Sequence, residues 1–342
     1  MTPAVLVALS LCLSVVAVSG SDGLDCPRFH PELRPIDVST AVMSRKRKLL
    51  NRLKECIETR GVNIDGLYFK SKHSGDNNTS LRTGLMLAVE LGLNDLARDF
   101  LHLHAGVDVA NHEGNTAALL VALKNIKNVN AIQILLGLGA DINWKNVDGI
   151  TLLMVAANNG FKKLLRHLIG RAAALNLQDK DGKTALHKAS DRGRASAAFA
   201  LVDAGANANL QDIYGWTPLM EAADSGYYKM ASYLLTHGVN TDLQDGNGWT
   251  ALIKAAAKGH TRIISALLIH GAKIDMKNDH GQTALNLAAR NGHVKSVSIL
   301  ANHGANLNLK DSHGYTALME ASHKGHEEVV AELLKQGANK RI

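Results

Sequence analysis

The sequence predicts an all-α repeat protein, a solenoid of helix–turn–helix units joined by β-hairpin-like turns and preceded by an N-terminal helical cap. Three observations support this fold class. Residues 212–244 have the pattern of two short helices separated by a turn. The same pattern recurs along the chain with a period of 33 residues. Aromatic residues make up only 4% of the 342 residues, as expected where short helices pack through small and aliphatic side chains.

The sequence of residues 212–244 indicates where each helix of one unit begins and ends. Thr217 is a suitable N-cap for the first helix, and Pro218 fits the first helical position, where no N–H is needed. The Ser225-Gly226 pair ends this helix, and Gly238 ends the second helix in a left-handed conformation. Each helix has only about ten residues, fewer than the roughly 12–15 that an isolated helix needs to be marginally stable. The unit must therefore bury its apolar faces against copies of itself.

Similar units flank this one on both sides. Their first helices begin with related segments, such as GWTALIKAAAKGH and GQTALNLAARNGH. The most divergent unit has Leu81 where glycine is expected, but Thr83, Ala88, Gly92 and the Gly106 cap keep their places. One unit is two residues longer than the period. The eight predicted units are residues 78–110, 111–145 (the longer one), 146–178, 179–211, 212–244, 245–277, 278–310 and 311–342.

A period near 33 with a turn, two helices and a T-x-L-x-x-A signature resembles the ankyrin repeat. The resemblance covers residues 78–342. It implies a solenoid that contacts a protein partner through its turn tips and the concave face of its first helices. Two departures from the family pattern are local: only Thr217-Pro218-Leu219 contains the proline, and only His187 supplies the histidine after that leucine. They concern the stability of single repeats and leave the predicted fold unchanged.

The resemblance also predicts which residues contact the partner. Aromatic and arginine side chains commonly contribute most of the binding energy at interfaces. Two tryptophans and a tyrosine share one turn position that we expect to be exposed; the alternative is that each packs on the neighbouring turn. The predicted partner-binding residues are Tyr214, Trp216, Trp249, His313 and Tyr315 at the turns, with His280 close by, and Arg192, Asp224, Lys258, Arg290, His323 and Lys324 at the ends of the first helices.

The histidines follow the repeat, which favours structural roles for them. His323 and His326 have a spacing that resembles a metal-binding pair, but no cysteine or carboxylate set completes a site. Two sets each share one repeat position: His260, His293 and His326 at the start of the second helix, and His237, His270 and His303 in its last turn, where a cationic side chain suits the helix dipole.

Catalytic motifs are also missing from the sequence. No G-x-x-x-x-G-K-[ST], G-x-S-x-G or H-E-x-x-H segment occurs. We therefore expect no catalytic residues, no metal, no cofactor and no small-molecule substrate. Nucleic-acid binding is not indicated, because the basic residues are dispersed, no aromatic-interleaved patch accompanies them, and the net charge of +7 is modest for this length.

The first 20 residues are mostly apolar and carry no charged side chain. The apolar run at residues 4–18 is shorter than the roughly 20 residues needed to cross a membrane, and small residues follow it. We expect a secretory signal peptide at residues 1–20, whose removal leaves no membrane span. The segment lacks a basic residue before the apolar run, so the alternative is an apolar N-terminus on an intracellular protein.

Two further features favour the secretory pathway. Cys26 and Cys56 remain as a pair after removal of the signal, and an oxidising compartment would allow them to form a disulfide. The alternative is that Cys56 is a core residue and Cys26 is free. Asn77 and Asn78 begin two overlapping N-glycosylation acceptors in a predicted polar loop at residues 71–80.

Residues 21–77 are predicted to be a leader and a capping helix. Apolar side chains at residues 41–60 fall at helical spacing, and residues 61–65 resemble the end of a repeat. Such a cap covers the apolar face that a first repeat would otherwise expose. The basic run at residues 45–48 is consistent with a solvated first turn, a nuclear signal, or a processing or acidic-polymer site.

These features together predict a non-catalytic, monomeric module that is secreted or lumenal and binds a protein partner. The alternative from a second class is an intracellular ankyrin scaffold or nuclear regulator, which requires that the N-terminus is not cleaved. A secreted toxin or effector is a third candidate and rests on analogy alone.

Overall fold

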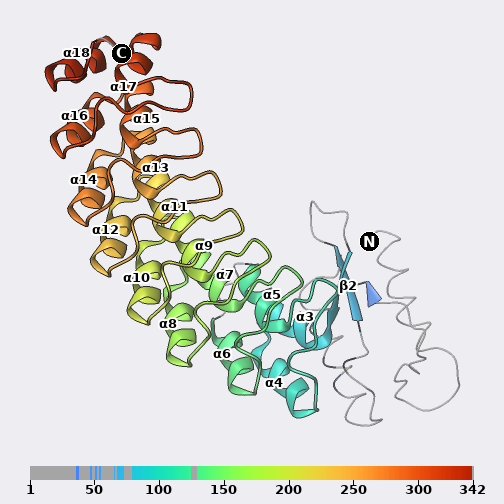
Figure 1. Ribbon diagram of the computed structural model, residues 1–342. Coiled ribbons are helices and arrows are strands. Elements are labelled where there is room, and N and C mark those ends of the chain that lie inside the picture. The colour runs from blue at the N-terminus through green and yellow to red at the C-terminus, as the bar shows by residue number, and fades with distance from the viewer. Residues whose placement is uncertain are drawn as a thin grey trace, which may run out of the picture. The chain divides into compact units, whose positions relative to one another are not determined.

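The computed structural model describes residues 79–124 and 129–340, the strand segments 36–37 and 68–72, and the single positions Arg47, Asn51, Lys54 and Asp65. The chain divides into two compact units, residues 1–152 and residues 153–342. Figure 1 shows the helices of both units as successive pairs. We describe each unit by itself.

In the first unit the structure gives the bounds of three short strands and four helices. β1 is parallel to β2, and β2 is antiparallel to β3, with Tyr68 opposite Thr83 and Lys72 opposite Thr79. The predicted polar loop at residues 71–80 is wrong at both ends, because pairing the two strands satisfies their backbone N–H and C=O groups. The elements are β1 Ile36–Asp37, β2 Tyr68–Lys72, β3 Thr79–Thr83, α3 Gly84–Glu90, α4 Asn94–His102, α5 Ala117–Leu123 and α6 Val129–Gly137.

Part of the predicted N-terminal cap lies within the described residues. Arg47, Asn51 and Lys54 are helical, and the Lys54 ammonium lies 2.7 Å from a carboxylate oxygen of Asp99 on α4. Both carboxylate oxygens of Asp65 accept the N–H of Gly106, at 3.0 Å each. Side chains at the ends of later repeats make the same kind of contact, which supports the predicted likeness of residues 61–65 to a repeat end. The prediction that Gly106 is the left-handed cap of the repeat at residues 78–110 is wrong, because His104, with a φ of 64°, takes that conformation two residues earlier. The rest of the predicted cap lies outside the described residues.

The second unit consists of helix pairs in its described residues. Figure 1 shows the first helices of the pairs side by side in one row and the second helices in another. The helices are α7 Leu152–Asn159, α8 Lys162–Gly170, α9 Ala185–Asp191, α10 Ala195–Asp203, α11 Pro218–Asp224, α12 Tyr228–Thr236, α13 Ala251–Lys258, α14 Thr261–Ile269, α15 Ala284–Arg290, α16 Val294–Asn302, α17 Ala317–His323 and α18 Glu327–Lys335.

Threonine residues fix where the first helices begin. The Thr217 hydroxyl accepts the N–H of Met220 at 3.2 Å, and Pro218 is the first residue of α11, as predicted. Thr184, Thr250, Thr283 and Thr316 cap their helices in the same way. Each cap satisfies a backbone donor that the helix itself cannot pair.

The core is a continuous layer of small and aliphatic side chains between neighbouring pairs. Leu219, Ala222 and Ala223 on α11 are at most 1% exposed, and α11 packs against α9, α12 and α13. Burying a leucine side chain contributes roughly 1.5–3 kcal/mol, so stability accumulates along the stack rather than within one pair. The all-α repeat fold predicted from the sequence is confirmed.

The turns that precede the first helices form a second layer, held together by hydrogen bonds between neighbouring repeats. The N–H of Gly246 donates to the Tyr214 carbonyl at 2.8 Å. The Gln211 amide donates both to the Gly215 carbonyl of the next turn at 2.7 Å and to the Gln244 carbonyl at 2.8 Å. Gln178 and Gln244 make the equivalent pairs of bonds. These turns therefore form a ladder that fixes the spacing of the repeats.

The histidines at the start of the second helices brace one repeat on the previous one. The ring Nε2 atoms of His260, His293 and His326 donate to the carbonyls of Asp224, Ala257 and Arg290, at 3.1, 3.0 and 2.9 Å. The other set differs slightly from the prediction: His237, His270 and His303 are C-cap residues, one position beyond their helices. His237 and His303 bond backbone carbonyls of their own last turn at 2.8 Å.

Candidate functional site

Each repeat from residue 179 onward starts its turn with a buried Asp or Asn. One carboxylate oxygen of Asp212 accepts the N–H groups of Tyr214 at 2.9 Å and Trp216 at 2.8 Å. The same two bonds occur at Asp179, Asp245, Asn278 and Asp311. These bonds hold the turn but use only one oxygen of each aspartate. The other oxygen of the buried carboxylate requires a positive partner.

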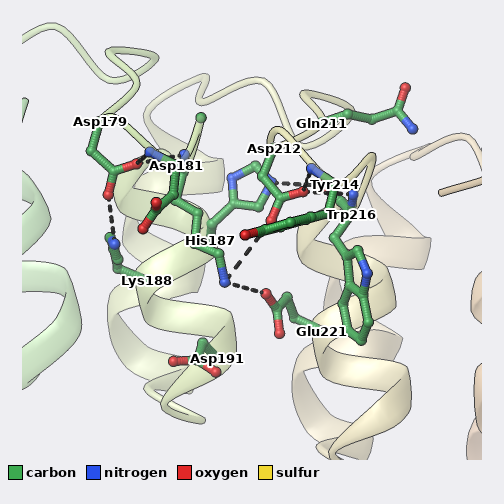
Figure 2. Close-up of polar contacts among 12 residues, drawn as sticks. Asp179, Asp181, His187, Lys188, Asp191, Gln211, Asp212, Tyr214, Trp216 and Glu221 are labelled. Carbon is green, nitrogen blue, oxygen red and sulfur yellow. Dashed lines mark hydrogen bonds and ion pairs between the residues drawn. The ribbon is translucent and has the colours of Figure 1, made fainter. Parts of the chain in front are cut away.

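Two of these aspartates have a lysine partner on their own first helix. The Lys188 ammonium lies 2.5 Å from Asp179, and the Lys254 ammonium lies 2.7 Å from Asp245. Figure 2 shows Lys188 pointing from its helix toward Asp179. In both cases the lysine is nine residues after the aspartate. The turn and the helix are therefore tied together by a buried ion pair.

Asp212 has an acidic residue, Glu221, at this helix position, and its cation comes from the previous repeat. The Lys183 ammonium lies 2.8 Å from the Glu221 carboxylate and 3.9 Å from Asp212. Burial opposes the charge of Lys183, but the hydrogen bond and charge of Glu221 outweigh it, so the pKa of Lys183 is raised. Burial also raises the pKa of Glu221, against the opposing effect of Lys183. One ammonium thus serves two carboxylates.

Trp216 and Trp249 are half-buried rather than exposed as expected. The Lys254 ammonium lies 3.4 Å from the ring centroid of Trp216 and 5.4 Å from that of Trp249. A cation over an aromatic face is attracted by the negative potential of the ring. Both tryptophans therefore have a structural role beside the Lys254–Asp245 pair, and their contact with a partner stays a prediction.

His187 joins two repeats from within the core. Its Nδ1 accepts the N–H of Thr184 at 3.2 Å, and its Nε2 donates to the Trp216 carbonyl at 3.1 Å. The ring is fully buried. Burial lowers the pKa of His187, and the bond to Trp216 only partly offsets this effect. The neutral ring is the form that makes both bonds.

The most exposed apolar pair on the turns is Ile213 and Tyr214, at 61% and 63%. The two residues are adjacent at one turn tip. Tyr214 was predicted to bind a partner, whereas Ile213 was missed, although its turn position is polar or glycine in the other repeats of this unit. Exposed apolar side chains at a tip are typical of interaction surfaces.

The predicted residues at the helix ends lie in different surroundings. Arg192 is exposed and lies 3.6 Å from Asp191, Asp224 is half-buried, and Lys258 is exposed. Arg290, His323 and Lys324 are brought together with His313 and Tyr315 around one pocket of about 350 Å³. His280, which the sequence placed close to the turn position, also lines this pocket, and the prediction missed three further lining residues: Gln282, Asp311 and Glu320.

Several predictions concern parts of the chain that the structure does not describe. Cys26, Cys56, Asn77 and Asn78 lie outside the described residues, as does the predicted signal peptide at residues 1–20. Within residues 79–124 and 129–340, no group of three or more His, Cys, Asp or Glu side chains is placed to hold a metal ion. In the same part of the chain, none of the helices combines the length and apolar character of a membrane span.

The stacked helix pairs and the hydrogen-bonded turns define a helical repeat protein. A family model for ankyrin repeats matches the chain in overlapping three-repeat segments: residues 85–177, 119–212, 153–245, 192–278, 234–311 and 267–342. The chain belongs to the ankyrin repeat family. No curated protein matches the sequence. Ankyrin repeats indicate a protein–protein interaction module, and the family is generally non-catalytic.

Proposed function

We propose that this chain is a non-catalytic binding module whose protein partner docks on the turn tips and first helices of residues 179–342. The observation that carries the proposal is the exposed pair Ile213 and Tyr214 at one turn tip. Both are large side chains with apolar surface, and the same two turn positions of the neighbouring repeats hold Lys180 and Asp181, and Gly246 and Asn247. Burying such a pair against a partner would supply the apolar centre that interfaces require.

The polar residues beside this tip suit the same role. Asp212, which precedes the tip, shares the Lys183 ammonium with Glu221. In the next repeat the Lys254 ammonium lies 3.4 Å from the Trp216 ring centroid and 5.4 Å from that of Trp249. Side chains that are already ordered lose less conformational entropy when a partner binds. The surface therefore offers a rigid frame around an apolar contact.

Binding should depend on the tip and not on apolar exposure in general. The double variant Ile213→Ser, Tyr214→Ser should weaken binding at least tenfold, because interface aromatics commonly contribute about 2 kcal/mol or more. Ile269→Ser is the matched control: Ile269 is 76% exposed, at the end of the second helix α14, away from the turns. The partner is first captured from extracts of the source tissue, identified by mass spectrometry and purified, and affinities are then measured by calorimetry.

Circular dichroism of both variants should match that of the parent chain, because no side chain that is removed is buried. Equal affinities for the parent and the double variant would reject the proposed surface. Loss of binding in Ile269→Ser alone would move the interface to the second helices.

We propose further that the module acts in the secretory pathway, as a secreted or lumenal protein. The apolar residues 1–20, the pair Cys26 and Cys56, and the acceptors at Asn77 and Asn78 support this location. An intracellular scaffold or nuclear regulator is the competing proposal, favoured by the basic run at residues 45–48.

A further inference from the structure

Two pairs of acidic residues occupy the same repeat positions, three repeats of 33 residues apart. The first pair is Asp212 and Glu221, and the second is Asp311 and Glu320. In each pair the aspartate closes the turn and the glutamate lies on the following first helix. The surroundings of Asp212 and Glu221 can therefore be compared directly with those of Asp311 and Glu320, as two versions of one site.

The first version contains a cation. Lys183 reaches in from the preceding repeat, with its ammonium 2.8 Å from Glu221 and 3.9 Å from Asp212. Glu221 is only 7% exposed, so this ammonium compensates two carboxylates that water reaches poorly.

The second version lacks this cation. Gln282 stands at the position of Lys183, and its carbonyl oxygen accepts a hydrogen bond from Asn278 at 3.3 Å. Asp311 and Glu320 are each 7% exposed. Among the described residues, no hydrogen bond reaches the Glu320 carboxylate, and the one cation within 4 Å of it is Arg290, whose Nε lies at 3.9 Å. No cation of the described chain lies that close to Asp311.

A pocket lies at this second site. Its volume is about 350 Å³, and Glu320, Asp311, Gln282 and Tyr315 are among its lining residues. Tyr315 stands where Trp249 stands two repeats earlier, and there an aromatic pair and a buried aspartate hold the ammonium of Lys254. The pocket thus combines the carboxylates and the aromatic ring that hold lysines elsewhere in this chain.

The rim of the pocket carries two side chains of the opposite charge, Arg290 and Lys324, and both are exposed, so water hydrates them. The rim histidines His280, His313 and His323 are exposed as well. The carboxylates of Asp311 and Glu320 are largely buried, and the donors that the described chain gives them are two backbone N–H groups at one Asp311 oxygen and Arg290, whose Nε lies 3.9 Å from Glu320. The energetic demand of this pocket is therefore for a cation.

We propose that this pocket receives a lysine side chain of the partner protein, whose ammonium lies between Asp311 and Glu320 as that of Lys183 lies between Asp212 and Glu221. The inference rests on the proposed function in one respect, namely that a protein supplies the lysine. Tyr315 covers the aliphatic part of the side chain, and the site selects a basic residue at a fixed distance from the apolar tip.

The site can be tested without the partner. The full chain, labelled with ¹⁵N, is titrated with the tripeptide acetyl-Gly-Lys-Gly-amide, and amide shifts are followed by NMR. The lysine peptide should give saturable shifts centred on residues 311–320, and the corresponding glutamine and glutamate peptides should not. In Gln282→Lys the new ammonium should occupy the site as that of Lys183 does in the first version. This variant should therefore bind the lysine peptide at least tenfold more weakly and have a Tm about 2–4 °C higher. Gln282→Met is the matched control and should change neither the peptide affinity nor the Tm.

Arg290→Gln distinguishes a cation site from an anion site. Because Arg290 is the nearby rival cation, its removal should strengthen binding of the lysine peptide several-fold. Saturable binding of the glutamate peptide, lost in Arg290→Gln, would show that the pocket recognises an acidic segment and would overturn the proposal. The proposal would also be overturned if the lysine peptide caused no amide shifts. The two proposals can also fail separately. If the pocket binds the lysine peptide but the partner binds the double variant Ile213→Ser, Tyr214→Ser as tightly as the parent chain, only the proposed docking surface is rejected.

Discussion

At the scale of single residues, the chemistry of this protein lies in how buried polar groups find partners. Lys254 illustrates the point: it is 4% exposed, and Asp245, Trp216 and Trp249 together hold it. Removing one member of such a set leaves another buried charge uncompensated, which generally costs about 3–5 kcal/mol. These residues are therefore poor choices for a mutation that is meant to test binding alone.

His187 should make stability depend on pH. Its pKa is lowered from the usual 6.5 by burial, so the folded chain binds the proton less readily than the unfolded chain does. The contribution of the neutral ring is fully present above pH 6.5 and is lost as the pH falls through the lower folded-state pKa. One proton changes stability by at most about 1.4 kcal/mol per pH unit.

The variant His187→Asn should flatten this dependence. Asparagine is native at the equivalent position of a later repeat, where the Asn286 side-chain oxygen accepts the N–H of Thr283 at 3.0 Å. Urea unfolding at pH 7, 6 and 5 should show the parent chain losing more stability than the variant. If the unfolding free energies of the two proteins fell equally between pH 7 and pH 5, His187 would not be the group that takes up the proton.

The sequence could locate the candidate site residues but not their surroundings. Trp216 and Trp249 were recognised from their repeated position, yet the cation that lies over the Trp216 ring is Lys254 of the next repeat. That contact depends on how adjacent repeats pack, which the period alone does not specify. Glu320 was missed for a related reason, because its significance is visible only when Gln282 is compared with Lys183.

At the scale of elements, the turn between the two helices of a repeat also links it to the next repeat. Gly226 has a φ of 75°, and a Cβ atom there would lie 2.6 Å from the His260 ring. That ring donates to the Asp224 carbonyl at 3.1 Å. The glycine thus allows both the left-handed turn and the bond between repeats.

Gly226→Ala should cost more stability than the same change at Gly325. Gly325 has a φ of 73°, and a Cβ atom added there would meet no neighbouring group within 4 Å, so an alanine introduces only the backbone strain. At Gly226 the His260 ring must also move, and its hydrogen bond is lost. The difference should be about 1 kcal/mol in urea unfolding. Equal losses for the two variants would indicate that the histidine bond contributes nothing.

Helix positions were predictable because the threonine caps, the glycines and the apolar spacing are local signals. The strands β2 and β3 were not predicted, since their sequences YFKSK and TSLRT are largely polar and short. The glutamine ladder could have been found from the 33-residue recurrence of Gln178, Gln211 and Gln244. Which carbonyl of the next repeat each glutamine bonds depends on how the repeats pack, and the sequence alone does not give this.

At the scale of the whole molecule, the repeat region and the N-terminal region raise different questions. Repeats of this kind are stabilised by their neighbours, so residues 179–342 have a structural reason for nearly every recurring side chain. What does not recur is then the best guide to binding, and Ile213, Tyr214 and the pocket beside Glu320 are the clearest such departures. The compartment in which the protein works decides which partners can reach them.

The N-terminus of the protein from its own cells should identify this compartment. If the secretory proposal is correct, the mature chain starts near Ser21, and its mass falls on treatment with a glycosidase specific for N-linked glycans. Asn77→Gln combined with Asn78→Gln should abolish that mass change. Non-reducing peptide maps should then contain a Cys26–Cys56 disulfide, because no other cysteine remains in the mature chain.

A chain that keeps residues 1–20, carries no glycan and has reduced thiols would reject the secretory proposal. The basic residues 45–48 would then become a candidate nuclear signal, testable by fusing them to a fluorescent protein.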